Sequence, residues 1–154
     1  MATVNRFEDL QVWQKARLFS KAIFDLTSQG SFSTDFDHKR QLRRAVDSVM
    51  DNIAEGFGRG NRNEFVHFLS IAKGSLEESK SQLYRALDRG YMKQSVFDDH
   101  YKTADEIAGM IRKLMQYLNQ STIKGSRYQS GNPSSKVEEP EMAYELVIDQ
   151  ESSR

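Results

Sequence analysis

The sequence has no cysteine and only two prolines among its 154 residues. The lack of cysteine excludes a disulfide framework, a zinc–thiolate site and thiol chemistry. Long apolar runs are missing too: no segment approaches the roughly 20 consecutive apolar residues that a membrane span needs. The first residues also lack the apolar run of a signal peptide. We therefore expect a cytoplasmic protein without a membrane partner.

An excess of charge of one sign is also absent. The chain has 22 Lys and Arg residues against 22 Asp and Glu residues, which gives a formal net charge of zero. Dedicated nucleic-acid-binding domains are usually far more basic than this. Any binding of nucleic acid must therefore rest on a local basic patch, which oligomerisation would repeat.

Apolar residues recur at helical spacing in four segments, which predicts four amphipathic helices. The four apolar stripes consist of Val12, Ala16, Phe19, Ile23 and Leu26; Leu42, Val46, Val49, Met50, Ile53 and Phe57; Phe65, Leu69, Ala72, Leu76, Leu83 and Leu87; and Phe97, Tyr101, Ala104, Ala108, Ile111, Met115 and Leu118.

Local signals predict where these helices begin and end. Either Asp35 or Asp37 suits the N-terminus of the second helix. Asn61 and Glu64 have the spacing of a capping box before the third helix, and Gly90 lies where that helix should end.

Four helices joined by short connections predict an all-α fold, an up-down-up-down four-helix bundle over residues 1–119. Residues 120–154 are rich in Ser, Gly and charge and contain both prolines. This composition predicts a flexible, disordered C-terminal tail.

Three glycines lie close together in the stretch NIAEGFGRGNRNEF. A phosphate-binding loop normally follows a β-strand and ends in GK[ST] or has the spacing GxGxxG, and this stretch has none of these features. We expect a corner between the second and third helices, in which Gly56, Gly58 and Gly60 adopt positive φ. Phe57 should tuck into the end of the bundle.

The densest basic cluster is HKRQLRR, at residues 38–44. Arg40 and Arg44 fall outside the apolar stripe, and acidic residues follow them, an order that opposes the helix macrodipole. Two interpretations remain open: a solvated face with pairs to Asp47, or a surface for a subunit or a nucleic-acid backbone. The candidate nucleic-acid-binding residues are Lys39, Arg40, Arg43, Arg44, Arg59 and Arg62.

Arg59 and Arg62 lie outside that cluster, beside the glycines. An arginine fork can bind a phosphate. The alternative is that these two side chains pair with Glu55, with Asp51 or with a neighbouring subunit.

No catalytic site can be assembled from the sequence. Glu64 and His67 have the Glu-x-x-His spacing of di-iron bundles, but such sites need a second motif of this kind, which the chain lacks. His67 should also lie on the outer face of its helix. We expect no catalytic residues, no metal and no cofactor, and hence no enzyme.

Several large apolar side chains fall beside the stripes rather than within them. Exposed apolar patches usually mark interfaces, so they predict a closed homo-oligomer. These residues are Trp13, Phe24, Ile71, Tyr84 and Tyr91.

Four stretches within residues 6–119 resemble a known family: LQVWQKA, QLRRAVDSV, NIAEGFGRG and EFVHFLSIAKGSLEESKSQL. They are similar to the four-helix bundle proteins encoded in intervening sequences of bacterial 23S ribosomal RNA genes. That family includes the accessory variability determinant (Avd) of diversity-generating retroelements.

The resemblance implies a barrel-shaped homopentamer without known catalysis. The retroelement members bind a reverse transcriptase and RNA through basic surfaces. Carried over by position, the family residues should serve fold and assembly, with close helix approach at Gly74 and Ser75. They are Asn52, Glu55, Gly56, Gly58, Arg59, Phe68, Gly74, Ser75 and Glu78.

These observations predict a non-enzymatic, homo-oligomeric scaffold associated with RNA or a ribonucleoprotein. One alternative is an Avd-type subunit that serves a reverse transcriptase and its template RNA. The other is a protein–protein adaptor without an RNA role.

Overall fold

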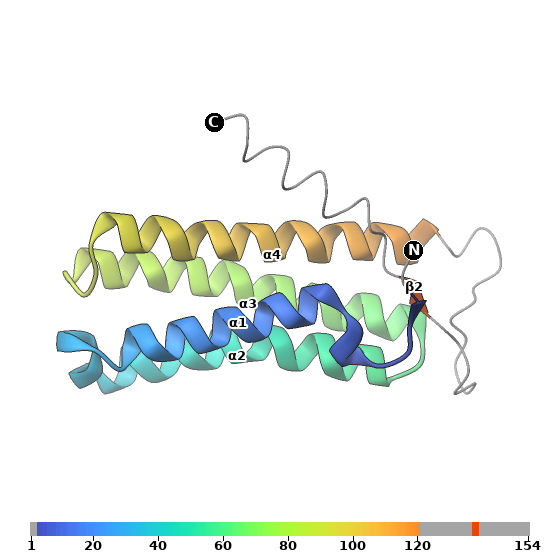
Figure 1. Ribbon diagram of the computed structural model, residues 1–154, viewed down its shortest axis with the longest axis horizontal. Helices are drawn as coiled ribbons and strands as arrows, with labels where there is room; N and C mark the ends of the chain where they lie inside the picture. Colours follow the sequence, from blue (N-terminus) through green and yellow to red (C-terminus); the bar gives the residue numbers. More distant parts are fainter. Residues whose placement is uncertain (1–2, 121–136, 139–154) are drawn as a thin grey trace, which may run out of the picture.

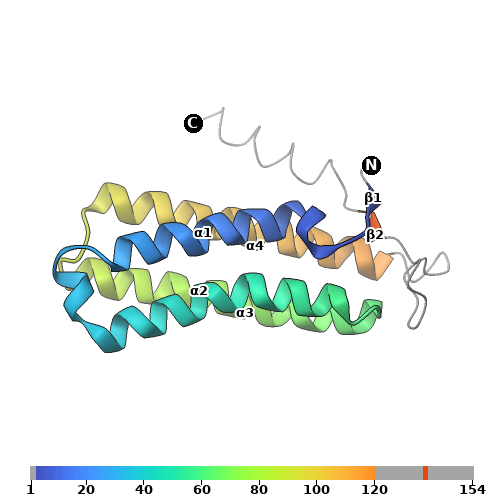
Figure 2. The same ribbon diagram turned by 60° about the horizontal axis from the view of Figure 1, so that its bottom comes forward.

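Four long helices form the bundle of this computed structural model, which describes residues 3–120 and 137–138. Figures 1 and 2 show that successive helices run antiparallel, so the prediction of an all-α four-helix bundle is confirmed. The helices are α1 (Gln11–Thr27), α2 (Phe36–Gly58), α3 (Arg62–Asp88) and α4 (Gln94–Gln120).

Short elements complete the bundle at its two ends. The 3-10 helix η1 (Phe7–Asp9) precedes α1, and η2 (Gly30–Thr34) joins α1 to α2. Strand β1 (Thr3–Val4) pairs antiparallel with β2 (Val137–Glu138). Of the predicted tail, residues 120–154, the structure describes Gln120 at the end of α4 and the two residues of β2. The rest of the tail lies outside the described residues.

Side-chain caps begin α2 and α3 as the local signals predict. The Asp35 carboxylate accepts a hydrogen bond from the His38 N–H at 3.2 Å. The Asn61 side chain accepts one from the Glu64 N–H at 3.1 Å. Each cap satisfies an N–H that has no partner within the helix.

The corner between α2 and α3 differs from its prediction. Of the three glycines, Gly60 alone has a positive φ, at 68°. Gly56 and Gly58 both lie within the last turn of α2, and Gly58 is its final residue. The expected positive φ is therefore wrong for both. Phe57 is partly buried against Phe65, as predicted, with ring centroids 5.9 Å apart.

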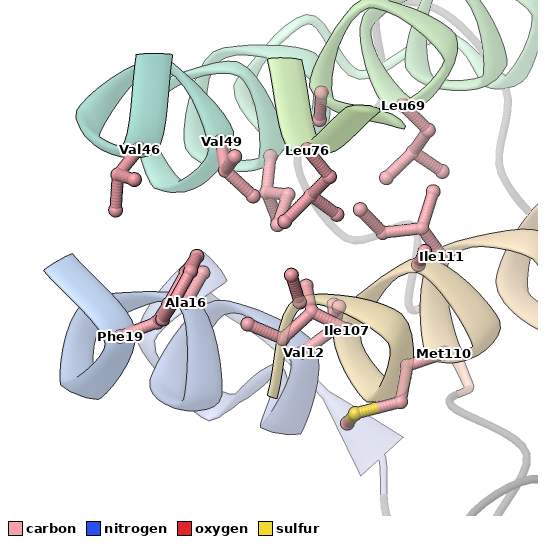
Figure 3. Close-up of a cluster of buried hydrophobic side chains, with 14 of the residues drawn as sticks. Val12, Ala16, Phe19, Val46, Val49, Leu69, Leu76, Ile107, Met110 and Ile111 are labelled. Carbon is pink, nitrogen blue, oxygen red and sulfur yellow. The ribbon is translucent and has the colours of Figure 1, made fainter. Parts of the chain in front are cut away.

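The core fills the space between the four helices, as Figure 3 shows for part of it. Phe19, Phe65 and Leu76 are fully buried, and each such side chain stabilises the fold by about 1.5–3 kcal/mol relative to exposure. The labelled core residues are Val12, Ala16 and Phe19 of α1, Val46 and Val49 of α2, Leu69 and Leu76 of α3, and Ile107, Met110 and Ile111 of α4.

Candidate nucleic-acid interface

The outer face of α2 carries an open groove of about 550 Å³. Its lining residues recur at intervals of three and four positions counted from Arg40, Arg44 and Ser48, so they share one side of the helix. The half nearer the N-terminus of α2 is basic, and the other half is acidic. The groove is lined by Arg40, Arg43, Arg44, Asp47, Ser48, Asp51 and Asn52.

Arg40 and Arg44 are exposed, and neither side chain has a hydrogen bond or an ion pair with the part of the chain that the structure describes. The alternative pairing of Arg44 with Asp47 does not form. Asp47 instead accepts a hydrogen bond from the Ser20 hydroxyl at 2.6 Å. Two cations on this face therefore remain available to an anionic partner.

Carboxylates limit how far the basic half extends. Burial, and then the negative charge of Asp47, raise the pKa of the Asp51 carboxyl above its ordinary value. The neighbouring carboxylates Asp47 and Asp51 repel each other, and they would also repel a phosphate in this half of the groove. An anion would bind at the arginine half.

Arg43 is committed to holding α1 against α2. Its Nε donates to the Thr27 hydroxyl at 2.7 Å and its Nη2 donates to the Ser28 hydroxyl at 2.9 Å. Its guanidinium also lies 4.1 Å from the centre of the Phe24 ring. Arg43 is therefore a bridge between helices rather than a free cation.

Lys39 is engaged in a similar way at the start of α2. Its Nζ donates to the Ser33 carbonyl at 3.0 Å and lies 5.0 Å from the centre of the Phe36 ring. Lys39 therefore anchors η2 to the first turns of α2.

The remaining two candidates lie at the other end of α2. Arg59 pairs with Glu55 at 2.9 Å and stands 5.2 Å from the centre of the Phe68 ring. Arg62 buries its Nε and Nη1 atoms, which have no hydrogen-bond partner among the described residues. The six predicted residues thus form two groups, and Arg40 and Arg44 are the pair best exposed to a partner.

The predicted apolar surface is correct in part. Phe24, Ile71 and Tyr84 are 54%, 40% and 50% exposed. Trp13 and Tyr91, by contrast, are partly buried: Trp13 packs on Phe7 of η1, with centroids 5.0 Å apart, and Tyr91 stacks on Phe32 of η2 at 4.8 Å.

Sequence reasoning also missed two exposed apolar residues. They are Leu18, at 67% exposure, and Phe36, at 59%. The burial of Trp13 and Tyr91 was missed because helical periodicity does not reveal the two 3-10 segments that cover them. Phe36, however, precedes Arg40 by one helical turn, and that spacing was a readable signal.

Most of the family residues lie along the contact between α2 and α3. The Asn52 amide donates to the Ser48 hydroxyl at 2.9 Å, and that hydroxyl lies 3.0 Å from the Ser75 hydroxyl. A Cβ added at Gly56 would lie 2.6 Å from the Phe68 Cβ. Close approach of α2 and α3 at this point therefore requires glycine.

Glu78, Gly58 and Gly74 do not serve that contact. Glu78 accepts a hydrogen bond from Gln82 of its own helix at 3.1 Å. A Cβ added at Gly58 or Gly74 would meet nothing within 4 Å. The expected close helix approach at Gly74 is thus wrong within this chain, and the exposed Gly74 faces outward from α3.

A polar cluster around the buried His38 lies where η2 and the α3–α4 connection meet, at the end of the bundle that Figure 2 shows on the left. His38 is buried, with Nε2 3.1 Å from the Gln82 carbonyl and Nδ1 3.1 Å from Arg89 Nη1. Arg89 also donates to Asp35 at 3.1 Å, and the Tyr91 hydroxyl donates to the same carboxylate at 2.6 Å.

The partners of His38 determine its protonation. A guanidinium can only donate hydrogen bonds and a carbonyl can only accept them, so Nδ1 is the acceptor and Nε2 carries the proton. Burial, and also the positive charge of Arg89, hold the pKa of His38 below its ordinary value. The cluster therefore holds a neutral histidine in place between η2, α2 and α3. Its residues are too distant in the sequence to be grouped by a motif.

We also searched the described residues for a metal site and for a membrane-spanning helix. Within residues 3–120 and 137–138, no group of three His, Cys, Asp or Glu side chains is arranged to hold a metal ion. His67 is exposed beside the Phe68 ring. None of the helices described is long and apolar enough to cross a membrane.

The model of one protein family, the 23S rRNA-intervening sequence proteins, matches residues 8–113. The chain belongs to this family. Its resemblance to the family is therefore confirmed over most of the bundle, and nothing in the match points to catalysis. A search of curated proteins finds no match to this member.

A solved structure shares the fold of this family member. It is a protein of unknown function from the S23 ribosomal protein family of Bacteroides thetaiotaomicron VPI-5482. The two chains are 20% identical, the match covers 68% of this chain and 95% of the other, and the TM-score is 0.64. At this level of identity the likeness concerns the fold alone.

Proposed function

We propose that this protein is a non-enzymatic, homo-oligomeric scaffold of the cytoplasm that binds RNA through the outer face of α2. The observation that carries the proposal is the pair Arg40 and Arg44, exposed at the basic end of a groove and without partners among the described residues. A guanidinium offers a fork of donors that matches phosphate oxygens.

Local helix energetics do not account for this pair. Cations stabilise the C-terminal end of a helix, whereas Arg40 and Arg44 lie in the first half of α2. A pairing with Asp47 or Asp51 would have compensated, but no such ion pair forms. An external anion supplies the missing partner.

Assembly would strengthen the weak field of a chain with zero net charge. Leu18, Ile71 and Tyr84 expose large apolar side chains, and such surface suits contacts between subunits. A ring of subunits, such as the pentamer that the resemblance implies, would repeat the arginine pair in every subunit. Repetition raises both the local potential and the avidity for a long polyanion.

The experiment is a titration of structured RNA with the full chain at several salt concentrations. Affinity should be measurable near about 50 mM salt and should fall steeply as salt rises, because binding releases counterions from the phosphates. Replacing both arginines by glutamine (Arg40→Gln with Arg44→Gln) should weaken binding and reduce the salt slope by about two.

A control with the same loss of charge is available elsewhere on the surface. Lys21 and Lys93 are exposed, so Lys21→Gln with Lys93→Gln should leave the salt slope unchanged. Light scattering should give one mass for all three proteins. If the wild-type chain retains no RNA even at low salt, the RNA proposal is wrong and the protein–protein adaptor becomes the better interpretation.

A further inference from the structure

Two exposed phenylalanines flank the partnerless arginines. Phe36 opens α2, Arg40 follows four residues later and Arg43 seven residues later, so the three lie on one side of the helix. Phe24 of α1 lies against the Arg43 guanidinium at 4.1 Å. The resulting row, Phe36–Arg40–Arg43–Phe24, extends about 10 Å along α2.

Each of the two rings lies against a cation and is still more than half exposed. Arg43 stacks on Phe24 while its donors reach Thr27 and Ser28, and the ring remains 54% exposed. Lys39 lies over Phe36 while its Nζ binds a backbone carbonyl, and that ring remains 59% exposed. Rings fixed in this way lose little conformational freedom when a ligand stacks on them.

We infer that this row, together with the neighbouring Arg44 of the groove, binds single-stranded RNA, with bases stacked on Phe24 and Phe36 and phosphates on Arg40 and Arg44; the inference rests on the proposed function. Aromatic side chains bind nucleic acid through the faces of unstacked bases, which a duplex hides. A duplex can use the arginines but not the rings.

The charges around the row suit this assignment. The N-terminal end of α2 carries the positive end of the helix dipole, which favours a phosphate near Phe36 and Arg40. Asp37 lies in the same first turn, and Asp47 follows Arg44 by three residues, so both carboxylates limit where a phosphate can sit. Phosphates therefore bind between them, beside the two arginines.

The test compares two RNA probes by fluorescence anisotropy: an unpaired strand of about 12 nucleotides, and the duplex of the same sequence. Phe24→Leu and Phe36→Leu keep an apolar side chain but remove the planar ring. Each should weaken binding of the single strand by about tenfold and leave duplex binding unchanged. The salt slope should stay at its wild-type value because neither ring contacts a phosphate.

Two controls accompany these variants. Phe24→Trp keeps a planar face and should retain single-strand affinity. His67→Leu removes an exposed planar ring from α3, outside the proposed subunit contact, and should change neither affinity. Thermal unfolding shows whether each variant keeps its fold.

The outcomes separate this inference from the proposed function. If the leucine variants bind both RNAs as the wild type does while the arginine variants lose binding, the scaffold function stands and the stacking row is wrong. If Phe24→Leu or Phe36→Leu instead changes the mass of the oligomer, the rings belong to a protein contact and the inference is overturned. If the wild type binds neither RNA, both proposals fail together.

Discussion

At Gly56, a single hydrogen atom sets how closely α2 approaches α3. The position is buried, and an added Cβ would lie 2.6 Å from the Cβ of Phe68 and 3.3 Å from the Phe65 ring. The end of a flexible side chain can rotate away, but a Cβ moves only with its backbone, so the two helices must separate.

We expect Gly56→Ala to destabilise the fold by about 1–3 kcal/mol, because overpacking shifts the backbone of a packed core. Gly58→Ala is the matched control, since its added Cβ meets no neighbour and its φ is not positive. It should leave the free energy of unfolding unchanged or raise it by up to about 1 kcal/mol, the ordinary advantage of alanine over glycine within a helix. Urea unfolding measures both changes, and equal midpoints for the two variants would contradict this account of the α2–α3 contact.

His38 makes the stability of the bundle depend on pH. Its folded pKa lies below the unfolded value of 6.5, mainly through burial. Between these two pKa values the unfolded chain binds a proton at this histidine and the folded chain does not. The free energy of unfolding therefore falls as the pH drops below about 6.5. His100 contributes in the same direction, because burial lowers its pKa also.

Urea unfolding between pH 7.5 and pH 5 should therefore show a falling free energy of unfolding. The fall should be at most about 1.4 kcal/mol per pH unit for each histidine. His38→Gln should be less stable at pH 7.5 but should show a smaller loss on acidification. A free energy of unfolding that stays constant over this range would show that the folded chain takes up protons as readily as the unfolded chain, which contradicts a lowered pKa for His38.

At the scale of the element, α3 begins with a cap that is local in sequence. Asn61 and Glu64 are three residues apart, and the Asn61 side chain satisfies the Glu64 N–H in the fold as in the motif. The same holds for Asp35 at the start of α2. Gly90, with a φ of 73°, ends α3, where the Tyr91 N–H reaches back to the Ala86 carbonyl.

Asn61→Ala should lower the free energy of unfolding by about 1 kcal/mol, because the Glu64 N–H loses its acceptor. Asn61→Asp keeps an acceptor and adds a charge that the helix N-terminus favours, so its stability should equal or exceed that of the wild type. Thermal unfolding by circular dichroism measures both variants. A loss for Asn61→Asp as large as that for Asn61→Ala would show that something other than the cap matters at this position.

At the scale of the whole molecule, the outer face of α3 offers a surface that none of the described residues covers. Ile71 is 40% exposed, and Gly74, one turn further on, is exposed and has no neighbour that requires glycine. A helical glycine costs stability, and close approach of another subunit would compensate for it. This surface is therefore our candidate for a subunit contact.

Light scattering should give the wild-type chain a mass that is a multiple of 17.7 kDa. Ile71→Asp should shift the protein toward a lighter species at micromolar concentration, because a buried carboxylate at an interface is unfavourable. Lys21→Gln serves as the control on α1 and should leave the mass unchanged. A single mass of 17.7 kDa for the wild type would refute the oligomer.

The sequence by itself determined the four helices, the Asn61 cap of α3 and the placing of Arg40 and Arg44 on an outer face. These features depend on residues within one or two helical turns of each other, so spacing reveals them. The match of residues 8–113 to the family agrees with what the four quoted stretches indicate.

Only the tertiary structure decided which cations are free, why Gly56 is glycine and how His38 is held. Arg43 turns to Thr27 and Phe24, Gly56 meets Phe68, and His38 meets Gln82 and Arg89. These partners lie 12 to 51 residues apart in the chain. Their contacts depend on how helices pack and where 3-10 segments close the bundle, and periodicity along one helix carries no information about either.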